Sequence, residues 1–291
     1  MTHPNIEAWR KEGDLETLQE TIHDGVPDEQ LRTRARSYRD SMFQLLYPQA
    51  RPRAGDRVLE IGPGVGWIME AVLETSPELA AIVGLDVSPE ISKAGLKRWT
   101  DPRAHFVSYD GLRWPFADDS LDVIYSCAAI QHVEKHFAFF IFSEAYRTLK
   151  PGGHAVLHVM SVHHMSHAAV PYEEEARHHV ESRTDLWWHH YYSYDELFSL
   201  LSEVIGVDDL DIQPMGTVDA FCVHFSKKTG NRFARPEVES LSYPVRFGDT
   251  QRAAALEGEL ALIKGSRAWK LATGIRSGWH LVNPRARRGP A

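Results

Sequence analysis

The stretch VLEIGPGVGW at residues 58–67 constrains the fold of this chain more than any other, because an apolar run there breaks directly into alternating glycines. Its first half suits a strand that is covered on both faces. The glycines permit a tight turn and let a ligand approach the backbone where a Cβ atom would block it. A helix predicted from about Trp67 to Thr75 would direct its free N–H groups toward that ligand. The pattern therefore predicts a nucleotide-like cofactor at the end of a buried strand.

The spacing of the glycines separates two classes of cofactor. A dinucleotide fingerprint, G-x-G-x-x-G, would need its third glycine at position 67, where this chain has Trp67. Glu60 stands two residues before Gly62, and its carboxylate would repel a pyrophosphate but attract a cationic ammonium group. The sequence therefore disfavours an NAD-dependent oxidoreductase.

Four further segments follow the glycine turn. Residues 81–88 predict a second apolar strand ending in Asp86, whose carboxylate can accept hydrogen bonds from both ribose hydroxyls. The other three are residues 105–111, 118–127 and 147–154, and the last contains the turn LKPGG before a fifth strand expected at 155–160. Each segment alone has an ordinary structural explanation, such as a helix cap or a helix stop, but the ordered set is specific.

Together the five segments resemble the motifs of the class I S-adenosylmethionine (SAM)-dependent methyltransferases, of the type 11/25 domain kind. The resemblance implies SAM as cofactor and S-adenosylhomocysteine as product. It also implies that Asp86 holds the ribose, that Asp110 takes the adenine amino group, and that the strand in 118–127 ends beside the transferred methyl. The cofactor-binding residues that it implies are Glu60, Gly62, Gly64, Gly66, Asp86, Val87, Asp110, Gly111, Ser126 and Cys127.

Strands and helices alternate along the predicted core, which favours parallel strands with right-handed crossovers. With the resemblance, this predicts an α/β, Rossmann-like fold, in which a seven-stranded, mostly parallel sheet carries helices on both faces. Residues 1–50 are predicted to form an N-terminal helical cap, residues 51–228 the methyltransferase core, and residues 229–291 a basic helical extension. A lid insertion rich in histidine and aromatic residues is expected at about 161–191.

The second half of the predicted cap carries a helical pattern from Asp28 to Leu46. Its apolar residues near one face are Leu31, Ala35, Tyr38, Met42 and Leu45. The resemblance implies that such helices cover the cofactor and the acceptor, and simple packing on the edge of the sheet is the alternative.

Composition and missing motifs exclude several function classes. The formal charge of −8 disfavours a nucleic-acid substrate, because phosphate binding needs a basic surface. The Asn/Asp-Pro-Pro-Tyr/Phe motif of base-modifying methyltransferases is also missing after the fourth predicted strand, where the sequence reads SCAA.

Two cysteines, Cys127 and Cys222, argue against a disulfide framework. Without a long apolar run or a signal pattern, the chain is expected to be cytoplasmic.

Two regions could supply a base for a hydroxyl acceptor, and the first lies just after the fourth predicted strand. His132 matches a hydrophobic-x-His run that family members carry there. A subset of the family binds a divalent metal at this place with E-x-x-E-H, but this chain has Ala128 and Gln131 in place of the carboxylates, so no metal is expected. His132 is a candidate base, with a structural histidine as the alternative.

The second region is the lid, where nine histidines fall between residues 154 and 190. Together with Trp187, Trp188, Tyr191 and Tyr192, these imidazoles suit a sugar or an aromatic ring. No H-E-x-x-H spacing of metal ligands occurs. The candidate bases soonest after the fifth predicted strand are His163, His164 and His167.

The leading hypothesis is a SAM-dependent methyltransferase that moves a methyl group by in-line displacement, with help from a histidine, to a hydroxyl of a small molecule or glycan. N-methylation of a small-molecule amine is the alternative enzyme. The alternative without catalysis is a scaffold or binding module in a glycan-assembly complex. The run GSRAWKLAT at 265–273 motivates it by resembling an S-R-x-W-[RK]-L-T segment of bacterial surface-glycan assembly enzymes; a secondary-metabolite pathway is also considered.

The basic C-terminal segment bears on partners. Beyond Glu259 the chain has seven Lys or Arg residues and no acid. Contact with an anionic membrane surface or with a protein is one interpretation, and a solvated tail is the other. A homodimer is also considered.

Overall fold

The computed structural model describes residues 26–162, 189–215 and 220–228. The chain divides into two units, Met1–Phe233 and Ala234–Ala291, and the second lies outside the described residues. The start of the predicted cap, most of the predicted lid and the whole predicted extension also lie outside them. Within the described part, no helix is long and apolar enough to cross a membrane.

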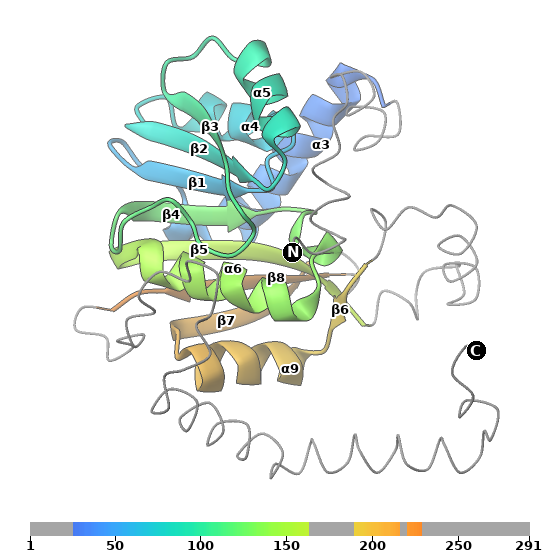
Figure 1. The fold of residues 1–291 in the computed structure, drawn as a ribbon, viewed down its shortest axis with the longest axis vertical. Helices are drawn as coiled ribbons and strands as arrows, with labels where there is room; N and C mark the ends of the chain where they lie inside the picture. Colours follow the sequence, from blue (N-terminus) through green and yellow to red (C-terminus); the bar gives the residue numbers. More distant parts are fainter. Residues whose placement is uncertain (1–25, 163–188, 216–219, 229–291) are drawn as a thin grey trace, which may run out of the picture. The chain divides into compact units, whose positions relative to one another are not determined.

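The strands of the described residues form one eight-stranded sheet (Figure 1). They are β1 (Arg57–Ile61), β2 (Ala81–Asp86), β3 (Ala104–Ser108), β4 (Leu121–Ser126), β5 (Leu149–Ser161), β6 (Tyr191–Tyr192), β7 (Asp208–Met215) and β8 (Ala220–Ser226). The order is β3-β2-β1-β4-β5-β8-β7, and β6 pairs with β5. Strands β1 to β5 are parallel, whereas β8 is antiparallel to β5 and β7. The predicted α/β, Rossmann-like sheet is confirmed, with one short strand beyond the seven expected.

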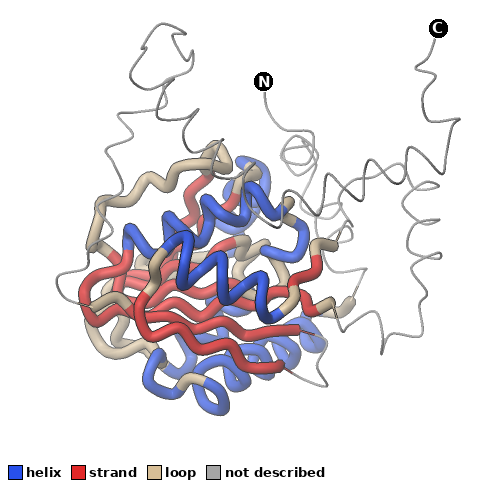
Figure 2. Tube along the Cα trace, turned by 90° about the horizontal axis from the view of Figure 1, so that it is seen from below, coloured by secondary structure: helices blue, strands red, loops and turns tan. Residues whose placement is uncertain are grey.

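Side chains of the central strands alternate between two apolar layers, so both faces of the sheet need a cover of helices. Leu59 and Ile61 of β1 belong to one layer, and Val58 belongs to the other. Figure 2 shows helices on both sides of the strands. The alternation explains why Val58, Leu59 and Ile61 are all apolar although they point to different faces of the sheet.

The helices divide between these two layers. The helices are α3 (Asp28–Asp40), α4 (Trp67–Thr75), α5 (Pro89–Arg98), α6 (Lys135–Thr148) and α9 (Tyr194–Phe198), with π-helices at Ser41–Leu46 and Ser199–Ile205 and 3-10 turns at Pro48–Ala50 and Ile130–His132. Buried residues of α3, α4 and α5 pack against one another, whereas α6 and α9 pack in the layer that contains Leu59. The predicted helix from Trp67 to Thr75 is confirmed.

Helix α3 lies along α4, held by both apolar and charged contacts. Its buried residues Leu31 and Ala35 pack with α4. Arg36 Nη2 lies 2.8 Å from a carboxylate oxygen of Glu74, and Arg39 donates to the carbonyl oxygen of Ala71 at 2.7 Å. Because exposed ion pairs contribute little each, the apolar contacts supply most of the stabilisation of this pair of helices.

Strand β5 begins earlier than the sequence predicted, at Leu149 instead of residue 155. Leu149 pairs with Leu121 and His154 pairs with Val123, so three extra residues of β5 bulge out of the ladder. The ammonium group of Lys150 lies 2.7 Å from the Asp122 carboxylate in this bulge. The predicted LKPGG turn is therefore a bulge inside the strand, because both of its sides keep pairing with β4.

Candidate active site

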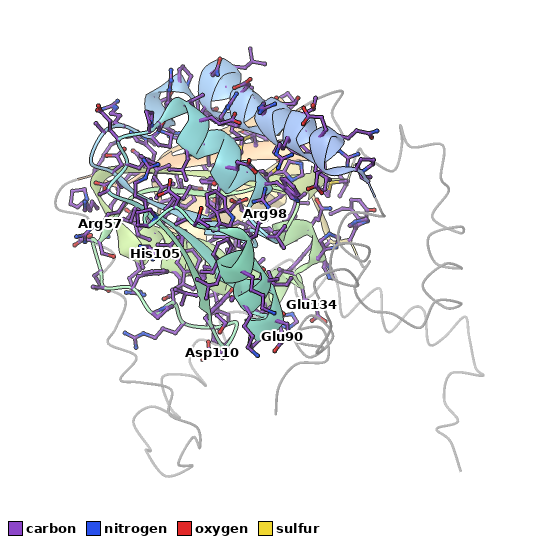
Figure 3. All side chains as sticks on the ribbon, turned by 90° about the horizontal axis from the view of Figure 1, so that it is seen from above. Arg57, Glu90, Arg98, His105, Asp110 and Glu134 are labelled. Carbon is purple, nitrogen blue, oxygen red and sulfur yellow. The ribbon has the colours of Figure 1, made fainter. Side chains whose placement is uncertain are left out.

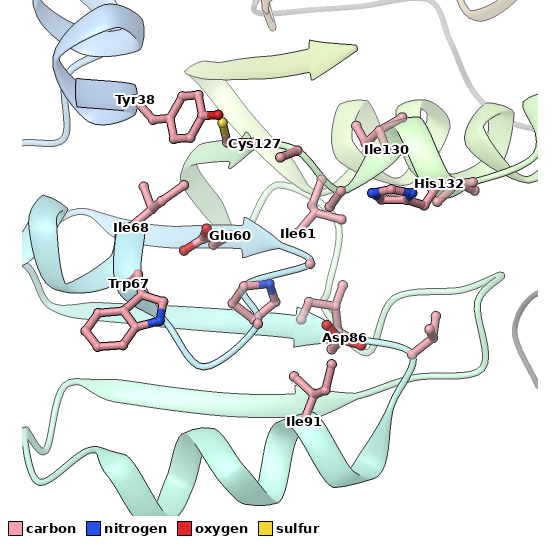
Figure 4. A pocket seen from close by; sticks show the side chains of 18 of the residues that line it. Tyr38, Glu60, Ile61, Trp67, Ile68, Asp86, Ile91, Cys127, Ile130 and His132 are labelled. Atoms are coloured by element: carbon pink, nitrogen blue, oxygen red, sulfur yellow. The ribbon is translucent and has the colours of Figure 1, made fainter. Parts of the chain in front are cut away.

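A pocket of about 270 Å³ lies at the carboxyl ends of β1, β2 and β4 (Figure 4). In parallel α/β sheets, ligands bind at this edge where the strand order reverses, here between β1 and β4. Its ionisable lining side chains include Arg34, Glu60, Asp86 and His132. Its apolar lining includes Leu31, Ile61, Ile68, Val87, Ile91 and Ile130. The pocket is thus mainly apolar with a few charged groups.

The glycine turn forms one wall of the pocket. The N–H of Gly62 donates to the carbonyl oxygen of Leu85 at 2.9 Å, which ties the end of β1 to β2. Gly62 has a φ of +65°, and a Cβ there would lie 2.3 Å from the Cβ of Ala129. Gly66 has a φ of +87°, and a Cβ there would lie 2.7 Å from Nε1 of Trp99. Only glycine satisfies both the backbone conformation and the close approach at these positions.

Asp86 ends β2 and faces the pocket while being only 9% exposed. One of its carboxylate oxygens accepts a hydrogen bond from the N–H of Ser88 at 2.9 Å. Burial raises the pKa of Asp86 to about 6, against the lowering effect of the backbone hydrogen bonds from Ser88 and Val87. A carboxylate can accept about four hydrogen bonds, so Asp86 can also receive hydroxyl groups of a ligand.

Glu60 is a second buried carboxyl group at the pocket, 1% exposed. Its Oε2 accepts a hydrogen bond from the phenol of Tyr125 at 2.9 Å. Burial raises the pKa of Glu60 to about 8, and hydrogen bonds from Tyr125 and Met69 lower it in part. A cationic group bound in the pocket would favour the ionised form of this side chain.

Replacing Glu60 with glutamine is expected to flatten the pH dependence of stability. Because the folded pKa of about 8 exceeds the ordinary 4.5, the folded chain binds this proton more tightly than the unfolded chain. The stabilisation is complete below about pH 4.5 and is lost as the pH rises through about 8. Glu60→Gln stays neutral, so its stability should rise relative to wild type by several kcal/mol across this range, since one pKa unit corresponds to about 1.4 kcal/mol.

Urea unfolding from about pH 5 to about pH 9 measures this difference. Glu74→Gln is the matched control, because Glu74 lies on the same side of the sheet but hydrogen bonds from Arg36 lower its pKa. If the stability of wild type and that of Glu60→Gln changed with pH in the same way, the raised pKa of Glu60 would be contradicted.

The turn after β4 is held in a rare conformation. Ala128 has a φ of +56°, and its N–H donates to Nδ1 of His158 at 3.3 Å. Burial lowers the pKa of His158 to about 4, so its ring is neutral at ordinary pH and accepts this hydrogen bond through Nδ1. The bond fixes the turn that brings Ala129 against Gly62. His158 therefore shapes the pocket from β5, a role that sequence did not assign to it.

His132 lies on the 3-10 turn Ile130–His132 and lines the pocket, on the side away from Tyr38 in Figure 4. Its ring centroid lies 4.9 Å from that of His189. The N–H of His190 donates to the carbonyl oxygen of Gln131 at 2.7 Å. The last residues of the predicted lid therefore pack on the turn that carries His132, although His163, His164 and His167 lie outside the described residues.

The structure brings most of the predicted cofactor residues together. Six line the pocket, and they are Glu60, Gly62, Gly64, Asp86, Val87 and Cys127. Gly66, Asp110, Gly111 and Ser126 are outside its lining. The hydroxyl of Ser126 donates to the carbonyl oxygen of Ile61, and Gly66 caps α4. Burial raises the pKa of the Cys127 thiol well above its ordinary value, which leaves the thiol neutral.

Asp110 is exposed and stands at the periphery in Figure 3. Its Oδ1 accepts hydrogen bonds from the N–H groups of Leu112 at 2.8 Å and Arg113 at 3.1 Å. It thus caps the turn that also contains Gly111. The neighbouring residue, Tyr109, is the one that lines the pocket.

Several pocket residues were not predicted as site residues. Leu31, Arg34, Ala35 and Tyr38 of α3 all line it. Leu31, Ala35 and Tyr38 belong to the amphipathic face that the sequence predicted, so that pattern could have indicated their place in the pocket. Arg34 gave none, because an arginine on a helix surface is ordinary.

The residues present fit SAM, which carries a ribose diol, a sulfonium cation and an amino-acid end with an ammonium group. Gly62 and Gly64 of the glycine turn line the pocket, Asp86 suits the diol, and Glu60 suits a cation. Among residues 26–162, 189–215 and 220–228, no group of three or more His, Cys, Asp or Glu is arranged to hold a metal.

Comparison with known proteins finds a methyltransferase domain in the part of the chain that forms the pocket. A family model described as a methyltransferase domain matches residues 58–153. Over 122 residues the chain is 34% identical to the ubiquinone/menaquinone biosynthesis C-methyltransferase UbiE of Dinoroseobacter shibae, covering 40% of this chain and 46% of that protein. The chain spans less than half the length of the curated relatives it matches first.

Solved structures share the fold at low sequence identity. One is the complex between the Haloferax volcanii Trm112 methyltransferase activator and a putative methyltransferase, with 19% identity and a TM-score of 0.51 over 75% of this chain and 100% of that chain. Another is phosphoethanolamine N-methyltransferase 2 of Haemonchus contortus in complex with SAM, with 14% identity and a TM-score of 0.51 over 75% of this chain and 60% of that chain. The sheet order, the glycine turn beside a buried Asp86 and the matching domain model together identify a class I SAM-dependent methyltransferase domain in this chain.

Proposed function

We propose that this chain transfers the methyl group of SAM to a hydroxyl of a small acceptor with a mainly apolar body, assisted by His132. The observation that supports this most is that one pocket joins the glycine turn, the buried Asp86 and His132. The first two suit the cofactor, and the third is a group that can accept a proton where an acceptor would enter.

Different residues of the pocket bind different parts of the cofactor. Asp86 accepts the ribose hydroxyls, and Val87 and Ile91 offer an apolar surface to the adenine. The turn at Gly62 and Gly64 lets the cofactor lie against the backbone. When bound, SAM supplies an electrophilic methyl carbon on a sulfonium, which is transferred by in-line displacement.

The chain's own contribution to the transfer is to position the acceptor and accept its proton. His132 takes the hydroxyl proton onto a ring nitrogen as the acceptor oxygen bonds to the methyl carbon and the carbon–sulfur bond breaks. Ile130 and Val133 flank it and exclude water from the reacting groups. The neutral Cys127 thiol adds no competing nucleophile.

The lining supports an apolar or aromatic acceptor over a glycan. The described lining is mainly aliphatic, with His132 as its histidine. The sequence had allowed either acceptor, because the lid is rich in histidine and aromatic residues. An apolar lining gains free energy from burying an apolar acceptor but leaves sugar hydroxyls without partners.

Transfer to a ring carbon of a hydroxylated aromatic acceptor is the second candidate. It is favoured by the name of the relative from Dinoroseobacter shibae, a C-methyltransferase of quinone biosynthesis. A phenol must lose its proton for either outcome, so His132 would serve both.

Incubating the purified chain with methyl-labelled SAM and a panel of phenols, aliphatic alcohols, amines and sugars tests the proposal, with the position of the label read by mass spectrometry and NMR. Labelled phenols support it; labelling of amines or sugars only, or binding of SAM without any transfer, would contradict it.

Replacing His132 with glutamine is expected to lower kcat with the accepted phenol by about 100-fold or more, because a positioned base contributes about 10²–10⁴ in rate. The affinity for SAM should stay the same, since His132 is assigned to the acceptor. The limb of the pH–rate profile that reports the base should also disappear. His136→Gln is the matched control, because His136 is exposed and lies near Glu134 away from the pocket lining. If His132→Gln kept full turnover, amine N-methylation or a base from the lid would replace this assignment.

A further inference from the structure

Gln131 contacts the proposed base, His132, directly. The nitrogen of its side-chain amide, Nε2, lies 3.3 Å from Nε2 of the His132 ring. Both residues belong to the 3-10 turn Ile130–His132, and the carbonyl oxygen of Gln131 accepts a hydrogen bond from the N–H of His190 at 2.7 Å. This backbone hydrogen bond and the short turn keep the amide beside the ring.

The orientation of this amide decides which ring nitrogen carries the proton. An amide nitrogen only donates, so in the observed orientation Nε2 of His132 must accept, and the proton of the neutral ring is on Nδ1. Oε1 of Gln131 is then buried and has no hydrogen-bond partner in the part of the chain that the structure describes. Rotating the amide by half a turn exchanges its oxygen and nitrogen in almost the same volume. The oxygen then accepts from Nε2–H of His132, and the lone pair of the ring lies on Nδ1.

Uptake of a proton by His132 selects between these two orientations. An imidazolium carries a proton on both ring nitrogens, so it can only donate to Gln131. The amide nitrogen would face another N–H group, whereas the amide oxygen accepts a charge-assisted hydrogen bond. The orientation with the oxygen toward the ring therefore stabilises the protonated ring and makes Nδ1 the basic atom of the neutral ring.

We propose that Gln131 is a positioning residue, which turns Oε1 toward Nε2 of His132 and so makes Nδ1 the atom that takes the proton of the acceptor. The inference rests on the proposed role of His132 and adds the residue that fixes its tautomer. Nδ1 binds the hydroxyl proton as the acceptor oxygen bonds to the methyl carbon, while the carbon–sulfur bond breaks and its electron pair goes to sulfur. Nε2–H stays bonded to Oε1 throughout.

Other ionisable side chains lie around this turn. The ring centroid of His189 lies 4.9 Å from that of His132. The remaining groups of the turn and of the segment packed on it are Glu134, Lys135, His136 and His190, and the pocket adds Arg34, Glu60 and Asp86. Variants of Gln131 retain all of these groups, so differences among the variants report on the amide contact.

Two substitutions of similar length test the inference through the pH–rate profile with the accepted acceptor. Gln131→Glu keeps an oxygen at Nε2 of His132 and adds a negative charge, so the limb that reports the base should move up by about one pH unit or more. Its kcat above that limb should remain close to that of wild type. Gln131→Met removes the oxygen, so kcat should fall by about tenfold or more, with the KM for the acceptor and the affinity for SAM unchanged.

Nitrogen-15 NMR of the His132 ring gives a readout that needs no turnover, with its signals assigned by their absence in His132→Gln. The neutral ring of wild type should carry its proton on Nε2, and Gln131→Met should show a mixture of both tautomers. Gln49→Glu is the matched control, because Gln49 is the middle residue of the 3-10 turn Pro48–Ala50, is exposed and is outside the pocket lining. It should leave both the limb and the tautomer unchanged.

Two results would overturn the inference alone. One is a base limb that stays in place in both Gln131 variants, and the other is a wild-type ring with its proton on Nδ1. Full turnover in His132→Gln would instead overturn the proposed function.

Discussion

Replacing Gly62 with alanine is expected to destabilise the fold by about 2–5 kcal/mol and to abolish SAM binding. A non-glycine residue in the left-handed region costs about 1–2 kcal/mol. The added Cβ would also lie 2.3 Å from the Cβ of Ala129, which overpacks a rigid contact at a further cost of about 1–3 kcal/mol. Relief of this clash must move either the glycine turn or the turn after β4, and both form walls of the pocket.

Thermal unfolding and calorimetry with SAM measure the two effects. Gly55→Ala is the control, because Gly55 also has a positive φ, of +82°, but a Cβ there would meet nothing within 4 Å. Gly55→Ala should therefore cost about 1 kcal/mol and leave SAM binding unchanged. A Gly62→Ala variant as stable as Gly55→Ala, with normal affinity for SAM, would refute the close approach of the two turns.

Replacing Asp86 with alanine is expected to weaken SAM and S-adenosylhomocysteine by about 100-fold or more, or to abolish their binding. The loss removes two charge-assisted hydrogen bonds to ribose hydroxyls, each of which contributes about 1.5–3 kcal/mol. It leaves those hydroxyls buried against an apolar wall that includes Val87 and Ile91. Calorimetry with both ligands gives the two affinities.

Asp86 should also make the affinity depend on pH. Its pKa of about 6 means that the free chain carries a neutral Asp86 at low pH, and a protonated carboxyl accepts hydrogen bonds less well. The affinity for S-adenosylhomocysteine should therefore fall as the pH decreases through about 6, and Asp86→Asn should remove that dependence. Wild-type affinity in Asp86→Ala would refute the assignment of the ribose to this carboxylate.

The local parts of the cofactor site were predictable from sequence because each rests on short-range rules. The strand before Gly62, the helix from Trp67 and the strand ending in Asp86 have the bounds expected from apolar runs and turn residues. The glycines were recognisable because a turn of this conformation excludes other residues. Covalent neighbours alone dictate these features.

The hydrophobic pattern of the sequence does not predict which residues are buried beyond the C-terminal end of helix α3. The amphipathic pattern placed Met42 and Leu45 near one face, yet Met42 is fully buried and Leu45 is 77% exposed. From Ser41 to Leu46 the helix is a π-helix, whose hydrogen bonds run to the fifth residue and widen the turn. The wider turn carries Leu45 off the buried face. Packing of Met42 and Phe43 against the sheet decides this, and no local pattern reports it.

By itself, the sequence determined the class of fold, the glycine turn and the position of Asp86 at the end of a strand, because tight turns and buried strands leave few residue choices. The tertiary structure decided which charges share the pocket. It brings Glu60 of β1, Arg34 of α3 and Asp86 of β2 into the lining of one pocket. It also places Asp110 outside the lining and bonds His158 to the turn that holds Ala128. These arrangements arise from long-range packing between segments, which the spacing of residues along the chain does not specify.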